Sequence, residues 1–103
     1  MSTVLGMTQI NGTVADGFGA VADAFEGNFS EFGEVGAAFS LYVDGELKAD
    51  LWAGVADKQT GRSWEQDTLQ LVFSTTKGAA AICVARLVEA GAISYGDAVA
   101  QHW

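Results

Sequence analysis

The chain has 103 residues, half of them hydrophobic and 17% charged, a composition that excludes a disordered chain. Thirteen acidic against five basic side chains give a formal charge of −8 at pH 7, which argues against nucleic-acid or anionic-membrane partners. One cysteine, Cys83, excludes an internal disulfide.

The N-terminal segment, Met1 to Ile10, has neither a basic nor an apolar run of the kind found in signal peptides. No apolar run in the chain approaches the length of a membrane span. We therefore expect a cytoplasmic protein without a membrane partner.

Apolar side chains then recur at spacings of three and four from Asp16 to Gly33. The spacing predicts an amphipathic helix with Asp16 as its N-cap and Gly33 as its stop. We interpret the stripe as core packing rather than a ligand site. Its members are Phe18, Val21, Ala22, Phe25, Phe29 and Phe32.

A β-hairpin is predicted next. Residues 35–43 are strand-like, and Asp44-Gly45 is a type I′ turn signal. The return strand alternates between an apolar and a charged face. Trp52 on this strand and Trp64, after a loop, are interpreted as packing side chains. The apolar face comprises Leu47, Ala49, Leu51, Ala53 and Val55.

A second helix is predicted from Thr75 to Ala90, with Gly91 as its stop. Between Ala79 and Ala90 only Arg86 and Glu89 are charged, a pattern typical of a helix buried on all sides. We interpret Cys83 on it as a buried small hydrophobe. One hairpin and one amphipathic helix cover about one side of it, so the chain lacks partners for its own central helix.

The final segment contains Ser94-x-x-Asp97, which predicts a capping box that opens a further helix running to Trp103. His102, the single histidine, is interpreted as a surface residue. No His, Cys and acidic residues have metal-ligand spacing, so we expect no metal and no cofactor.

The strongest chemical signal is Ser74-x-x-Lys77 at the start of the second helix. Residues three apart share a helix face, so the Ser74 hydroxyl and the Lys77 amine can meet. An amine in apolar surroundings can be neutral and take the serine proton, and helix N-terminal N–H groups suit an oxyanion. The motif alone is weak, because three lysines and six serines produce it by chance in roughly one such chain in six.

Several segments in order raise its specificity. Together they resemble the serine β-lactamase-like hydrolases, in the branch with class C β-lactamases, DD-peptidases and family VIII carboxylesterases. The Leu-Trp-x-Gly strand and the terminal Trp favour the carboxylesterases. The matching segments, within a resemblance that covers most of the chain from about Thr13, are VGAAF (35–39) with VDG (43–45), LWAGVAD (51–57), TGRSW (60–64), DTL (67–69), VFSTTKG (72–78) and ISYGDAVAQHW (93–103).

This resemblance implies an acyl-enzyme hydrolysis of small esters with Ser74 and Lys77 as catalytic residues, β-lactams or D-alanyl peptides being the alternative substrates. Such enzymes also carry a Tyr-x-Asn (or Ser-x-Asn) motif and a Lys-Thr-Gly-like strand downstream, and neither occurs in these 103 residues. We therefore expect residues 1–103 to be the N-terminal portion of one hydrolase domain, inactive alone.

The fold class expected is α+β: an N-terminal helix on an antiparallel hairpin, then the buried helix carrying Ser74. The expected partners are a small ester or amide substrate and the missing C-terminal part of the same protein, with self-association in its absence. A non-catalytic truncated fragment, or one piece of a complemented assembly, is the other reading left open.

Overall fold

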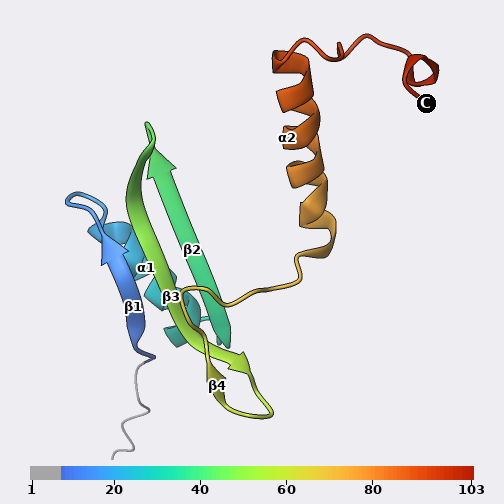
Figure 1. Ribbon diagram of the computed structural model, residues 1–103. Helices are drawn as coiled ribbons and strands as arrows, with labels where there is room; N and C mark the ends of the chain where they lie inside the picture. The colour runs from blue at the N-terminus through green and yellow to red at the C-terminus, as the bar shows by residue number, and fades with distance from the viewer. Residues whose placement is uncertain (1–7) are drawn as a thin grey trace, which may run out of the picture. The chain divides into compact units, whose positions relative to one another are not determined.

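The computed structural model describes residues 8–103 and confirms the α+β class (Figure 1). The chain divides into two compact units, one ending at Leu69 and one from Gln70 to Trp103. The prediction that Met1 to Ile10 contains no signal peptide lies mostly outside the described residues.

The first unit is an antiparallel sheet with one helix. Its elements are β1 (Ile10–Val14), α1 (Gly19–Ser30), β2 (Gly36–Val43), β3 (Glu46–Asp57) and β4 (Arg62–Ser63). The strand order is β1-β3-β2, and the short β4 also pairs with β3.

The predicted hairpin is confirmed as β2 and β3, with Val43 opposite Glu46. Asp44 and Gly45 have φ of 51° and 78°, the two positive values that a type I′ turn requires. Strand β1 had not been predicted, because five residues interrupted by a glycine give no clear alternation. At Gly12, φ is +107°, and a Cβ there would collide with the carbonyl oxygen of Asp50.

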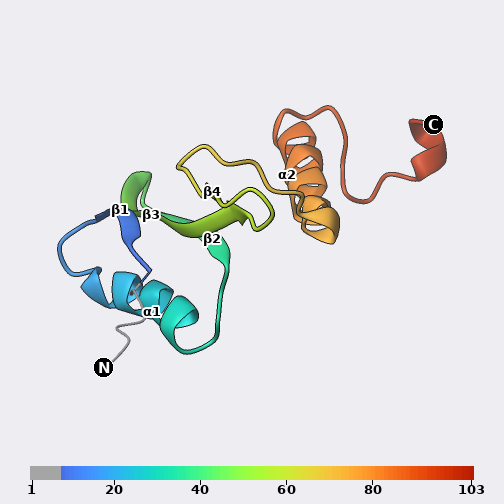
Figure 2. The same ribbon diagram turned by 90° about the horizontal axis from the view of Figure 1, so that it is seen from below.

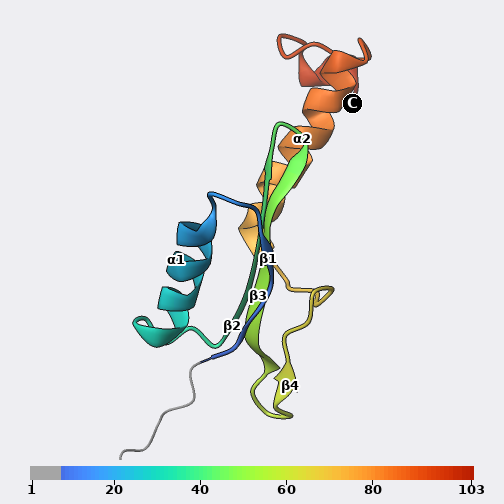
Figure 3. The same ribbon diagram turned by 90° about the vertical axis from the view of Figure 1, so that its left-hand side faces the viewer.

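Helix α1 lies against one face of the sheet (Figure 3), and the core side chains lie between them. Phe25 and Phe29 pack edge to face with ring centroids 5.6 Å apart. They cover Leu51 and Ala53, which are 3% and 0% exposed, as the alternation in β3 predicts. Small residues in the strand let the two rings approach the sheet closely.

Two details of the first helix differ from the prediction. It begins at Gly19 rather than Asp16, because the Phe18 N–H already bonds to the Ala15 carbonyl in a turn, and Phe18 caps the helix without a side-chain bond. Phe32 lies beyond the helix end and is 80% exposed, so it is not core. Gly33, with φ of +71°, does mark the stop.

The second unit contains η1 (Phe73–Thr75), α2 (Thr76–Glu89) and η2 (Val99–Gln101). The stop at Gly91 is confirmed: φ is +76°, and the N–H groups of Gly91 and Ala92 bond back to Val88 and Leu87.

The helix predicted after Ser94 is wrong. Asp97 Oδ2 accepts the Ser94 N–H at 2.9 Å, as a capping box would, but only a turn forms. Gly96 disfavours a helix there. A fresh start at Ala98, whose N–H bonds to Gln101 Oε1 at 2.8 Å, gives the single 3-10 turn η2.

The cover that the apolar pattern of α2 calls for is not supplied by its own unit, as expected for a chain that lacks partners for this helix. No residue of α2 is buried among residues 8–103, and Cys83 is exposed rather than part of a core. An all-round apolar pattern predicts what a helix needs around it, and the residues of the second unit do not provide that cover. No helix in residues 8–103 has the length and apolarity to cross a membrane.

Candidate active site

The segment around Ser74 is a helix start. In η1 the first backbone bond runs from Thr75 N–H to the Val72 carbonyl at 3.0 Å, and α2 continues directly from Thr76. The N–H of Ser74 precedes that bond and has no partner inside the turn. It therefore stands at the positive end of the helix dipole, where a developing negative charge is stabilised.

Ser74 and Lys77 meet as their spacing predicts. Lys77 Nζ donates to Ser74 Oγ at 3.2 Å. The same contact serves proton transfer in the opposite direction when the amine is neutral, since the Ser74 hydroxyl can then donate to it. The structure thus brings together both residues that the sequence singled out.

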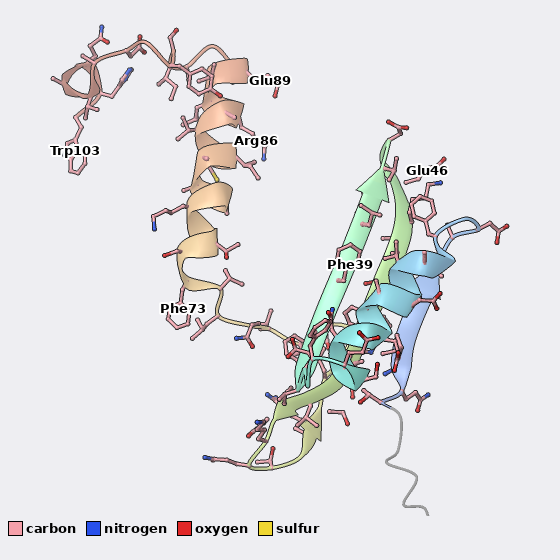
Figure 4. All side chains as sticks on the ribbon, turned by 180° about the vertical axis from the view of Figure 1, so that it is seen from behind. Phe39, Glu46, Phe73, Arg86, Glu89 and Trp103 are labelled. Carbon is pink, nitrogen blue, oxygen red and sulfur yellow. The ribbon has the colours of Figure 1, made fainter. Side chains whose placement is uncertain are left out.

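Phe73, immediately before Ser74, has an unusual backbone. Its φ of 46° is one of two positive values among the described non-glycine residues, and the other belongs to the hairpin turn. A bulky residue in this region carries of order 1–3 kcal/mol of strain. The side chain projects from the foot of α2 and is 81% exposed (Figure 4). Nothing in the sequence signals this conformation, because the motif specifies residue types and not φ.

The apolar enclosure predicted around Lys77 is not built by residues 70–103. Ser74 and Lys77 are both exposed, and so are the apolar neighbours Leu71 and Val72. A hollow of this unit, about 450 Å³, is lined by Leu87, Tyr95 and Trp103 among others and does not include Ser74. In the described part of the second unit, Ser74 and Lys77 therefore lie together on an exposed surface, away from this hollow.

Two carboxylates have lowered pKa values, and both belong to turns. The Gln59 N–H first, then the Thr60 hydroxyl, lower the pKa of Asp57 at the end of β3. The Ser94 N–H first, then His102 with Nε2 at 2.9 Å, lower the pKa of Asp97. Neither group contacts Ser74 or Lys77, so we assign both to local structure.

No set of three or more His, Cys, Asp or Glu side chains within residues 8–103 is arranged to hold a metal ion. Lys77 is the charged side chain that lies at the Ser74 hydroxyl. A hydroxyl beside an amine can support nucleophilic attack and proton transfer.

Comparisons with known proteins identify the family of the chain. The family model described as Beta-lactamase matches residues 25–103. The chain is 35% identical over 95 residues to Esterase/beta-lactamase LipL from Mycobacterium tuberculosis (strain ATCC 25618 / H37Rv). The matched region covers 92% of this chain and 22% of LipL. It is similar to the crystal structure of a family VIII carboxylesterase with 46% identity and a TM-score of 0.87, over 92% of this chain and 26% of that one. The chain thus spans about a quarter of the length of these relatives.

Proposed function

Because the chain belongs to the β-lactamase family, we propose that the whole protein is a serine hydrolase that cleaves small carboxylic esters through an acyl-enzyme on Ser74. The observation that carries the proposal is the 3.2 Å contact between Lys77 Nζ and Ser74 Oγ at a helix start. Similarity to a family VIII carboxylesterase at 46% identity supports an ester as the substrate.

The acylation step follows from the two side chains. Ser74 Oγ bonds to the carbonyl carbon of the ester, while its proton passes to the neutral amine of Lys77. The carbonyl oxygen becomes an oxyanion that the Ser74 N–H stabilises. Collapse of the tetrahedral species breaks the ester C–O bond. The leaving alkoxide takes the proton from the Lys77 ammonium and departs as an alcohol, which leaves the Lys77 amine neutral.

Deacylation repeats the cycle with water. A water molecule loses a proton to Lys77 as its oxygen bonds to the acyl carbon, and the bond to Ser74 Oγ breaks as the serine recovers a proton. The family resemblance implies that a tyrosine outside these 103 residues shares the proton transfers with Lys77. A second oxyanion donor, on a strand also outside them, is implied in the same way.

A β-lactam or a D-alanyl peptide is the alternative substrate class. The β-lactam alternative is supported by the name of the relative LipL, which is described as an esterase/β-lactamase. The same nucleophile and base would open a lactam ring by forming the same acyl bond to Ser74. Residues 1–103 alone are proposed to lack turnover, because the residues around Ser74 form no cleft.

Steady-state hydrolysis distinguishes these substrates. In the whole protein we expect turnover of a short p-nitrophenyl ester with a kcat/KM at least about tenfold above that for a chromogenic cephalosporin, a preference of about 1.4 kcal/mol or more. Ser74→Ala should abolish both activities, and Thr75→Ala, which changes a hydroxyl in the same turn, should keep them. Ester hydrolysis that survives Ser74→Ala contradicts the proposal. A higher kcat/KM for the cephalosporin would assign a β-lactam, rather than an ester, as the substrate class.

A further inference from the structure

Phe73, the residue before Ser74, has a left-handed backbone with φ of 46°. The Thr75 N–H bonds to the Val72 carbonyl at 3.0 Å and closes a turn whose central residues are Phe73 and Ser74. Ser74 is not among the positive-φ residues of the described chain, so the turn has the sign pattern of type II′, positive and then negative. Glycine is preferred at the first central position of such a turn, and phenylalanine there is strained.

The backbone becomes right-handed directly after this turn. Thr75 and Thr76 have φ of −59° and −57°, with ψ of −24° at both. The Phe73 carbonyl accepts the Thr76 N–H, so Phe73 supplies an acceptor to the helix although its own φ is not helical. Because a left-handed residue cannot continue a right-handed helix, α2 cannot extend backwards through Phe73. The chain accordingly reaches the foot of α2 from the side rather than along the helix axis (Figures 1 and 2).

The residues before Ser74 contain no other signal that would begin the helix at this point. Residues 70–73 are Gln-Leu-Val-Phe, without proline, glycine or an N-cap side chain, and Val72 makes no side-chain capping bond. Their helix propensities would allow α2 to begin one turn earlier. The Ser74 N–H would then donate to the Gln70 carbonyl four residues back and would no longer be free for an oxyanion.

We propose that Phe73 is a positioning residue for Ser74. Its left-handed backbone sets the start of the helix at the nucleophile and keeps the Ser74 N–H free as an oxyanion donor. Lys77 lies three residues further on, in contact with Ser74 Oγ, so one helix start holds the donor, the nucleophile and the base together. The inference rests on the proposed function. Backbone preference, rather than the phenyl ring, then decides which residues work at position 73.

The test measures two properties of the whole protein: the rate at which a fluorophosphonate acylates Ser74, and kcat and KM for a p-nitrophenyl ester. Phe73→Val and Phe73→Leu are a matched pair, because both residues are apolar but only valine branches at Cβ, which makes a positive φ more costly. We expect Phe73→Val to slow acylation by about tenfold or more and to lower kcat without raising KM, because an oxyanion donor acts in the transition state. Phe73→Leu and Phe73→Gly should each stay within about twofold of the wild-type rate.

Thr75→Val is the control for valine itself. It places the same side chain at a right-handed position of the same turn and should also stay within about twofold of the wild-type rate. A wild-type rate in Phe73→Val overturns the proposal, and so does equal slowing by Phe73→Leu, which would assign the effect to the ring.

Should Phe73→Val fail to fold, Phe73→Gly and Phe73→Ala decide the question, because both lack the ring and differ in the cost of a positive φ. The glycine variant should have a thermal midpoint higher by about 2 °C and an acylation rate no lower than that of the alanine variant. Equal midpoints would mean that residue 73 is not left-handed in the whole protein and would overturn the proposal. Labelling at a residue other than Ser74 would instead contradict the proposed function.

Discussion

The two units divide structure and chemistry between them. The first unit has a core in which Phe25 and Phe29 of α1 cover the small side chains of β3. The second has no buried residue in α2, yet it carries Ser74 and Lys77 in hydrogen-bond contact. Local helical spacing is enough to bring Ser74 and Lys77 together, whereas long-range packing is needed to form the core of the first unit. Each property is therefore tested by substitutions in its own unit.

The largest expected effect is on the stability of the first unit. Phe29→Ala removes one of the two rings of the core and should destabilise it by about 3–5 kcal/mol. Hydrogen exchange of peptides from β2 and β3 would show the loss of protection. Phe32→Ala, on the exposed ring beyond the helix, is the matched control and should stay within about 0.5 kcal/mol. Equal losses of stability in the two variants would mean that Phe29 does not belong to the core.

The next effect is on chemistry alone. Lys77→Arg keeps a cation beside Ser74 but cannot accept a proton near neutral pH. We expect acylation to slow by about 100-fold or more, with exchange protection in β2 and β3 unchanged. Arg86→Lys, in the last turn of α2, is the matched control and should have the wild-type rate. Near-normal turnover in Lys77→Arg would mean that the lysine acts only as a charge.

The exposed apolar surface of α2 gives the third prediction. Residues 1–103 alone should self-associate through side chains such as Ile82 and Leu87, which are 64% and 48% exposed. Light scattering would measure the mass, and Ile82→Gln with Leu87→Gln should return it toward that of a monomer. A monomeric chain without these changes would show that its charge of −8 outweighs the apolar surface.

The smallest effect concerns pH and compares one turn in each unit. The pKa values of Asp57 and Asp97 both lie below the ordinary value of 3.8, each held down first by a backbone N–H. A depressed folded pKa contributes stability that is present above the unfolded value and is lost as pH falls through the folded one. Both turns should therefore loosen below about pH 4.

Amide exchange of Gln59 and Ser94 measures these two turns separately. Asp57→Asn and Asp97→Asn should each remove the acid dependence of its own turn and leave that of the other. Acid loosening of both turns in either variant would point to global unfolding instead.

Much of the fold was predictable from sequence because its signals are local. The alternation of apolar and charged residues predicted β3, and Asp44-Gly45 predicted the hairpin turn. Gly91 predicted the end of α2. The errors arose where a longer-range choice decides. Ser94 and Asp97 form the expected hydrogen bond, but no helix follows it. Cys83 was predicted to be buried and is exposed. The apolar sequence of α2 indicates that the helix needs packing partners, but it does not show that the chain contains them.

The candidate site shows the same division. The contact between Ser74 and Lys77 follows from helical spacing, so the sequence predicted it. The positive φ of Phe73 has no sequence signal.

The central claim is that Ser74 is the nucleophile. The most direct test is to treat the whole protein with a fluorophosphonate and to map the modified residue by peptide mass spectrometry. We predict a single label on the peptide containing Ser74, retained in Thr75→Ala and Thr76→Ala and lost in Ser74→Ala. A label that persists in Ser74→Ala, or that maps to another serine in the wild-type protein, would contradict the account.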